Sequence, residues 1–221
     1  MITEDHLQGH WRRDWIKAPG FEDHTTRVHW MQAGDLFADL RIPVTRPDLS
    51  GHSCLADLSP GALHILLLSE GFAGTIDVTD DRCTWRREIN WHGVPEADDV
   101  GLMYFEGNAL MEAGVLAEYR ERWLQEGATG MRAQRVSLDD MSGVFVENDA
   151  VFVLAMGPSP DTHQPATTND AAMQAQFTST YTLGYWQGER GIATLSTNPF
   201  CEGQPVLKRN AALVWHALSF D

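Results

Sequence analysis

The charged residues with the clearest chemical potential lie on segments whose pattern otherwise indicates a buried strand face. A two-residue turn at Asp80-Asp81 fixes the register of the hairpin that it closes, so cross-strand partners can be counted outward from it. The partners on one face are Val78 with Cys83, Ile76 with Trp85, Gly74 with Arg87, and Phe72 with Ile89. Six of these eight residues are apolar, so Arg87 is a cation on a predicted core face, opposite a glycine that leaves room beside it.

Arg87 needs an anionic partner, because an unpaired guanidinium inside a barrel is costly and its fork of donors suits a carboxylate. Asp39 is one candidate, and an Asp39–Arg87 contact would be a structural ion pair. The other candidate is the anionic group of a small, partly apolar ligand, with aromatic rings as walls. Counting around the turn at Ala33-Gly34 places Asp39 on one face with Trp30, Phe37 and Arg41. The predicted ligand-binding residues are therefore Trp30, Phe37, Asp39, Arg41, Trp85 and Arg87.

Other chemistry has little support in the sequence. It contains no Gly-x-Ser-x-Gly elbow, no Walker loop and no Gly-x-Gly-x-x-Gly motif. His6 and His10, or His52 and Cys54, have spacings that could suit a metal, but neither pair has the further ligands that a tetrahedral site requires. The sequence therefore predicts no catalytic residue, no metal and no cofactor, and an enzymatic function is unsupported.

The elements that must position these side chains are short β-strands, which recur about every ten residues with turn signals between them. In the first half we expect strands at 11–16, 26–32, 36–42, 71–79, 83–91, 100–106 and 109–115. The segment 59–68 predicts a short helix, because Ser59 suits the N-cap and Pro60 the first helical position. This pattern predicts an all-β fold, either an antiparallel sandwich or a barrel.

The second half of the chain repeats this order of elements, which predicts an internal duplication. Residues 119–124 echo 11–16, and the hairpin 145–152 echoes 30–37. A second short helix is expected at 171–176, after a polar segment at 158–168.

We expect two closely packed units, 1–115 and 116–221, because no linker rich in proline or glycine separates them. The polar cluster belongs to the first unit alone. Asp39, Arg41 and Arg87 align with Leu154, Met156 and Thr194 in the second unit. This asymmetry favours a ligand site in the first unit over a requirement of the fold.

Seven short antiparallel strands per unit, with one helix after the third, look like a lipocalin-like (calycin) barrel. Further resemblance is carried by Trp30, Gln32, the segment 38–43, Gly71-Phe72-Ala73-Gly74 and Cys83-Thr84-Trp85. In these residues the chain resembles a family of uncharacterised bacterial proteins related to a fungal casein-kinase-interacting protein with two such barrels. The resemblance implies tandem lipocalin-like antiparallel β-barrel units, each with one short helix, and no established chemistry. The Gly-x-Trp entrance motif of lipocalins and the haem-binding nitrobindin signature are both missing.

The composition limits the partners. Acidic residues outnumber basic ones 31 to 16, and the formal charge of −15 argues against nucleic acid. The acidic start predicts no signal peptide, and the apolar runs are too short to span a membrane. Three scattered cysteines fit reduced thiols in the cytoplasm. The alternative to a ligand-binding protein is a non-enzymatic protein–protein interaction module.

Overall fold

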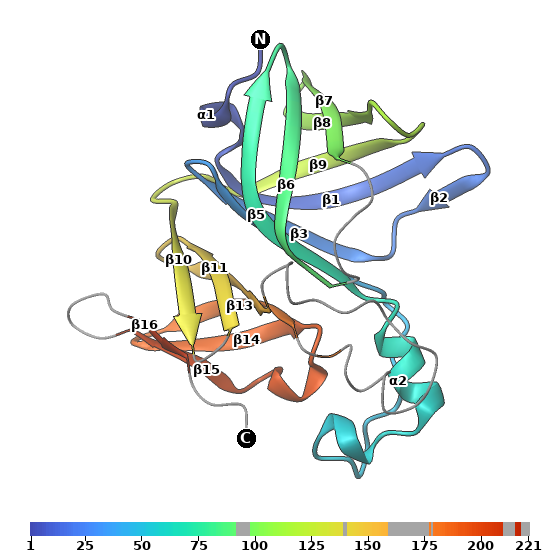
Figure 1. Cartoon of the computed structure of the whole chain (residues 1–221), viewed down its shortest axis with the longest axis vertical. Coiled ribbons are helices and arrows are strands. Elements are labelled where there is room, and N and C mark those ends of the chain that lie inside the picture. The colour runs from blue at the N-terminus through green and yellow to red at the C-terminus, as the bar shows by residue number, and fades with distance from the viewer. Residues whose placement is uncertain (92–97, 139–140, 159–176, 178, 210–214, 218–221) are drawn as a thin grey trace.

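The computed structural model describes residues 1–91, 98–138, 141–158, 177, 179–209 and 215–217. These residues form two antiparallel sheets and two α-helices, which confirms the predicted all-β class (Figure 1). The predicted helix at 171–176 and most of the polar segment at 158–168 lie outside the described residues.

The first sheet is a closed barrel. Its strands are β1 (Gly9–Ala18), β3 (Arg27–Ala33), β4 (Leu36–Ile42), β5 (Glu70–Thr79), β6 (Arg82–Asn90), β7 (Asp99–Glu106), β8 (Ala109–Gly114) and β9 (Arg120–Gly127). Each strand pairs with its neighbour along the chain, and β9 returns to pair with β1, so that Arg13 lies opposite Trp123. A short strand, β2 (Phe21–Asp23), extends the sheet beside β1. Closure leaves the eight barrel strands without a free edge.

The second sheet is curled and packs below the barrel in the view of Figure 1. Its strands, in spatial order, are β10 (Arg132–Leu138), β11 (Met141–Glu147), β12 (Val151–Gly157), β13 (Thr180–Gln187), β14 (Arg190–Ser196), β15 (Pro205–Arg209) and β16 (Trp215–Ala217). Within the described residues no pairing joins β10 to β16. The protein therefore combines one closed barrel with one open sheet.

The seven strands predicted in the first half are all present, with ends that differ by at most two residues. Helix α2 (Pro60–Leu66) begins as expected, and the Ser59 hydroxyl oxygen accepts a hydrogen bond from the Ala62 N–H at 3.3 Å. The expected boundary after residue 115 lies between β8 and β9, whereas the change of sheet lies between β9 and β10. Residues 119–124, which echo 11–16, therefore pair with them inside the same barrel.

The first hairpin turns at Gly34-Asp35 and not at the expected Ala33-Gly34, so Trp30 lies opposite Asp39. The shift is two residues, which keeps the predicted face.

The predicted register of the β5–β6 hairpin is wrong at its far end. Val78, Ile76 and Gly74 face Cys83, Trp85 and Arg87 as expected, but Phe72 faces Asn90, and Ile89 faces Ala73. The register shifts between Ala73 and Gly74, which leaves Glu88 as one extra residue on β6. Beyond this bulge the alternation reverses, so Ile89 points to the outside of the barrel.

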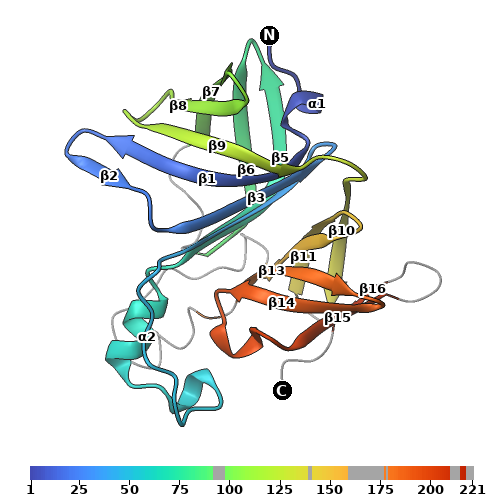
Figure 2. The same ribbon diagram turned by 180° about the vertical axis from the view of Figure 1, so that it is seen from behind.

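The outer face of the barrel carries a core of its own. Residues from β3 to β6 pack against β11 to β14 in one cluster that contains Met31, Leu40, Ala73, Ile89, Val146, Val153, Tyr181 and Leu195. Figure 2 shows the same two sheets from behind, with the second sheet against this side of the barrel. The strands that carry Asp39 and Arg87 are thus covered on their outer face, which fixes the position of their inward-pointing side chains.

Candidate functional site: the polar end of the barrel

The interior of the barrel contains an aromatic layer. The rings of Trp11, Trp85 and Trp123 surround that of Trp30, with centroid distances of 6.1, 5.9 and 5.7 Å. Leu7 of the N-terminal helix α1 (Glu4–Leu7) joins this cluster, and its carbonyl accepts a hydrogen bond of 2.7 Å from the Trp11 indole. The cluster is a packed core at this level of the barrel.

Three of the predicted ligand-binding residues belong to this apolar cluster. Trp30, Phe37 and Trp85 are 1%, 0% and 6% exposed. Phe37 contacts Phe72, with 6.0 Å between ring centroids. These residues therefore lie beneath the polar residues of the barrel and pack mainly against other aromatic rings.

The polar residues follow from the alternation of the strands. Every second side chain of a strand points into the barrel. On four strands, an inward-pointing aromatic residue is followed or preceded, two positions away, by an inward-pointing charged residue. These pairs are Trp11 and Arg13, Phe37 and Asp39, Trp85 and Arg87, and Trp123 and Glu121. The polar layer, as we call it below, consists of Arg13, Asp39, Arg41, Arg87, Asp99, Glu112 and Glu121.

Asp39 and Arg41 pair with each other along β4. The Arg41 Nε lies 2.9 Å from Asp39 Oδ1, and a second guanidinium nitrogen lies 3.5 Å from Oδ2. Burial raises the pKa of Asp39, an effect that the Arg41 charge opposes. Asp39 therefore holds Arg41, whereas the sequence offered it as the partner of Arg87.

Arg87 has a different acidic partner. Its guanidinium donates to Asp99 Oδ2 at 2.5 Å and to Asn90 Oδ1 at 3.2 Å. Asn90 faces the interior only because of the bulge at Glu88, and Asp99 lies opposite Trp85 on β7. The requirement for an acidic partner is thus confirmed. Counting from the β5–β6 turn could not predict Asp99, because Asp99 lies on β7, after the connection that follows this hairpin.

Arg13 and Glu121 were missed by the sequence reasoning, since Glu121 was placed in the second unit. The Arg13 guanidinium lies 2.7 Å from Glu121 Oε1 and 3.1 Å from Asp23 Oδ2. Arg41 also reaches Glu121 Oε1, at 3.5 Å. The closing strand β9 therefore supplies a carboxylate that links two of the three guanidinium groups of the polar layer.

Phe72 separates the polar layer from the aromatic layer on one side. The guanidinium carbons of Arg87 and Arg41 lie 3.6 and 4.9 Å from the centroid of its ring, which are cation–π contacts. The side chains of Arg41 and Arg87 remain 20% and 21% exposed, so this part of the layer reaches solvent. Within the described residues, the buried Nε of Arg87 has no hydrogen-bond acceptor.

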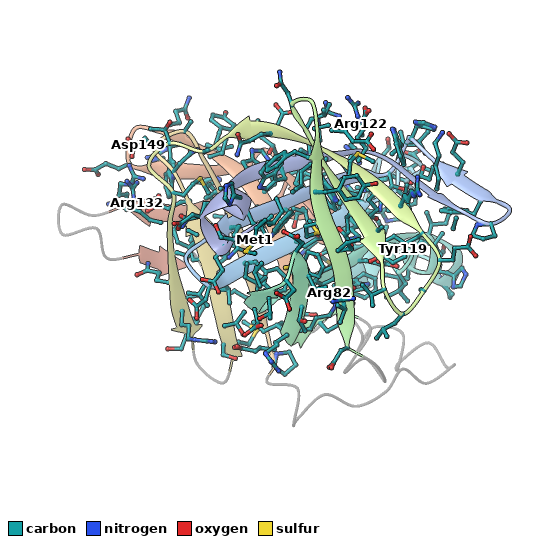
Figure 3. All side chains as sticks on the ribbon, turned by 90° about the horizontal axis from the view of Figure 1, so that it is seen from above. Met1, Arg82, Tyr119, Arg122, Arg132 and Asp149 are labelled. Atoms are coloured by element: carbon teal, nitrogen blue, oxygen red, sulfur yellow. The ribbon has the colours of Figure 1, made fainter. Side chains whose placement is uncertain are left out.

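Glu112 completes the polar layer from β8. Its two carboxyl oxygens accept hydrogen bonds from the Tyr119 hydroxyl at 2.7 Å and from the Trp123 indole at 3.1 Å. Figure 3 shows Tyr119 at the side of the barrel, next to the turn between β8 and β9. Burial raises the pKa of Glu112 to about 8, and the charges of Glu121 and Asp99 add to this effect.

His6 and His10, whose spacing could suit a metal, have separate partners. The His6 ring lies 2.7 Å from the Thr3 hydroxyl, whereas His10 contacts His29. Cys54 is an exposed free thiol. Over the part of the chain that the structure describes, no three or more metal-ligating side chains come together, and no helix is long and apolar enough to cross a membrane.

Comparison with known proteins adds a likeness of fold. No protein-family model and no curated protein sequence matches the chain. The crystal structure of the uncharacterized protein YLR301w from Saccharomyces cerevisiae is similar, with a TM-score of 0.59 and 11% sequence identity. The match covers 95% of this chain and 97% of the yeast chain, so it includes both sheets. At this level of identity the likeness concerns the fold alone.

Proposed function

We propose that this protein is a non-enzymatic, lipocalin-like binding protein whose barrel takes a small anionic, partly apolar molecule at its polar end. The observation that carries the proposal is the Arg87 side chain. It is partly exposed, its guanidinium lies against an aromatic ring, and its buried Nε has no acceptor within the described residues. A ligand carboxylate would supply that acceptor.

The neighbouring residues suit the same ligand. Arg41 is the second partly exposed cation, and Asp39 holds it in place. Phe72 offers an apolar surface between the two guanidinium groups and the aromatic layer. Trp30, Phe37 and Trp85 would form the floor of the site, so ligand binding should change tryptophan fluorescence.

The lipocalin-like description and a cytoplasmic location belong to this proposal. A barrel in which each strand pairs with the next along the chain is the architecture of that class. The three cysteines are free thiols, which suits a reducing compartment.

A screen of small acids tests the proposed ligand class. Fatty acids, aromatic carboxylic acids and tetrapyrroles are added to the purified protein, and the melting temperature and tryptophan fluorescence are measured. We expect at least one aromatic or aliphatic acid to raise the melting temperature. The Arg87→Gln variant should bind that acid about tenfold or more weakly, because a charge-assisted hydrogen bond is lost.

Arg86→Gln is the matched control, because Arg86 is the exposed neighbour of Arg87 on β6. This variant should bind like the natural protein. Equal losses of binding in the two variants, or an absence of any thermal shift across the three classes of acid, would refute the proposal.

An interaction with another protein is the second candidate, favoured by exposed apolar side chains on β7 and the β8–β9 connection. Leu102, Val115 and Leu116 are 40%, 42% and 65% exposed. The Val115 N–H bonds to the carbonyl of Val100 at 2.9 Å, so these residues come from adjoining segments. To test this function, the natural protein and the Leu116→Glu variant are cross-linked to their protein partners. A partner that is captured by the natural protein but not by the variant, together with a negative acid screen, would favour this function.

A further inference from the structure

Glu112 and Glu121 lie directly opposite each other inside the barrel. They are cross-strand partners on β8 and β9, and their neighbours Leu110 and Trp123 pair in the same way in the apolar cluster. The two glutamates are 5% and 1% exposed. Like charges in such a pair repel each other, and burial strengthens the repulsion because little water screens it.

Among the described residues, the cations of the polar layer form ion pairs with only one of these glutamates. Glu121 Oε1 lies 2.7 Å from the Arg13 guanidinium and 3.5 Å from that of Arg41. Glu112 receives neutral donors, the Tyr119 hydroxyl and the Trp123 indole. Among the described residues, none forms an ion pair with Glu112, so a negative charge there would be buried without a cation in direct contact.

The second oxygen of Glu121 needs a donor. Glu121 Oε2 is buried and has no hydrogen-bond partner among the described residues. An ionised carboxylate only accepts hydrogen bonds, whereas a protonated carboxyl group also donates one. A proton on Glu112 would remove the repulsion and provide a donor on the side chain that faces Glu121.

We infer that Glu112 and Glu121 form a carboxylic acid–carboxylate pair that holds one proton at neutral pH, with the proton on Glu112. The pKa of about 8 for Glu112, caused by burial and by the charges of Glu121 and Asp99, supports this. The structure thus contains a proton-binding site that follows from strand register and burial.

The other charged and titratable groups around the pair come from five strands and the β8–β9 connection. Cys83 on β6 is a buried thiol whose pKa burial raises, so it is neutral. The remaining groups are Arg13 on β1, Asp23 on β2, Asp39 and Arg41 on β4, Arg87 on β6, Asp99 on β7 and Tyr119 before β9. With Glu112 and Glu121 included, five carboxyl groups accompany three guanidinium groups. A bound proton lowers this negative excess by one.

The bound proton has a consequence that rests on the proposed function. An anion that enters beside Arg41 and Arg87 would be repelled less by the polar layer while Glu112 is neutral. Its affinity should therefore fall as the pH rises above about 8, the pKa of Glu112. The proton itself is present without ligand, so it can be tested in the ligand-free protein.

The test compares the natural protein with Glu112→Gln in urea unfolding between pH 6.5 and 9.5, without ligand. Below pH 8 the folded protein holds a proton that the unfolded chain, with its ordinary pKa of 4.5, has released. The ratio of folded to unfolded protein should therefore fall about tenfold per pH unit up to pH 8, relative to the variant. Above pH 8 the two stability curves should run parallel.

Glutamine is a neutral substitute whose carbonyl can accept from Tyr119 and whose amide can donate to Glu121, although the bond from the Trp123 indole is lost. The variant should fold with a lower stability, and the comparison uses the slope of stability with pH. Glu118→Gln is the matched control, because Glu118 is exposed in the same turn and its removal should leave the slope unchanged. Carboxyl-carbon NMR of the natural protein is the second readout. It should show one glutamate titrating near pH 8, and that signal should be missing in Glu112→Gln.

Parallel stability curves over the whole pH range would overturn the inference. So would NMR spectra in which all glutamates titrate below pH 6. Neither result would decide the proposed function, which the acid screen tests independently. If the screen is negative while the slope is present, the proton pair stands and the ligand proposal falls.

Discussion

Two histidines on the outer face of the barrel also make the stability of the protein depend on pH. They should lower the stability as the pH falls, whereas Glu112 should lower it as the pH rises. His10 Nε2 and His29 Nδ1 lie 2.9 Å apart on the neighbouring strands β1 and β3. Burial lowers the pKa of His10 to about 4 and that of His29 to about 3. Both rings are therefore neutral in the folded protein at pH values where the unfolded chain begins to protonate them.

This pair predicts a loss of stability in acid. The contribution of the two neutral rings to the free energy of unfolding is fully present above pH 6.5, the ordinary histidine pKa. It is lost as the pH falls through the pKa of His10, about 4, and that of His29, about 3. Each histidine should contribute a slope of about 1.4 kcal/mol per pH unit in this range. In urea unfolding between pH 6 and 4.5, His29→Gln should show a clearly shallower slope than the natural protein.

The exposed His52 provides the control for this measurement, and His52→Gln should keep the natural slope. If the slope of His29→Gln also matches the natural one, proton uptake at the His10–His29 pair does not govern the acid sensitivity.

At the scale of single residues, the sequence predicted what Arg87 requires but not which residue supplies it. Alternation along one hairpin is local, so the inward position of Arg87 could be counted from the turn. Asp99 lies on β7 and Glu121 on β9, which are later strands of the barrel. The residues that these two carboxylates meet are therefore determined only when the barrel closes. Counting outward from a hairpin turn gives only the partners within that hairpin, so it cannot predict such long-range pairing.

At the scale of strands, the bulge in β6 decides which side chains enter the polar layer. It turns Asn90 inward and Ile89 outward, and it leaves Glu88 on the surface, where it pairs with Arg135 of β10. Gly74 makes this geometry possible. A Cβ atom at Gly74 would lie 2.0 Å from the backbone oxygen of Arg86.

The bulge predicts that Gly74→Ala is destabilising. The methyl group would collide with backbone, which cannot move aside as a flexible side chain can. We expect a loss of about 1–3 kcal/mol in the free energy of unfolding, measured in urea.

Gly61→Ala in helix α2 is the comparison, because a Cβ atom there meets nothing within 4 Å. This variant should be neutral or slightly stabilising. Equal stability of the two alanine variants would mean that β5 and β6 can pair without the close approach at Gly74.

The elements themselves were largely predictable, because turns and two-residue alternation leave a local signal. The assignment of β9 was not, since its resemblance to β1 suggested the start of a second unit. A closing strand presents inward-pointing aromatic and charged residues much like the strand with which it pairs, here Trp123 and Glu121 beside Trp11 and Arg13. Sequence similarity alone cannot separate pairing from duplication.

At the scale of the whole molecule, the two sheets depend on each other. The apolar cluster between them combines the outer face of the barrel with one face of the second sheet, and Tyr181 packs closely over Gly71. Arg46, from the connection between β4 and β5, adds an ion pair of 2.6 Å with Glu202. The barrel is closed by its own strands, but its outer face requires a cover.

A chain truncated after residue 130 tests this dependence. It keeps every barrel strand and loses the second sheet, so Met31, Leu40 and Ile89 would face water. We expect a lower melting temperature by circular dichroism and binding of a hydrophobic dye. An unchanged melting temperature without dye binding would show that the barrel is stable by itself.

The binding of an anion at Arg87 is tested most directly by a crystal structure of the complex with the acid that raises the melting temperature most. We predict an acidic oxygen of the ligand within hydrogen-bond distance of Arg87 Nε, with the apolar part of the ligand against Phe72. A ligand bound elsewhere, with Arg87 still paired only with Asp99 and Asn90, would contradict the proposed site.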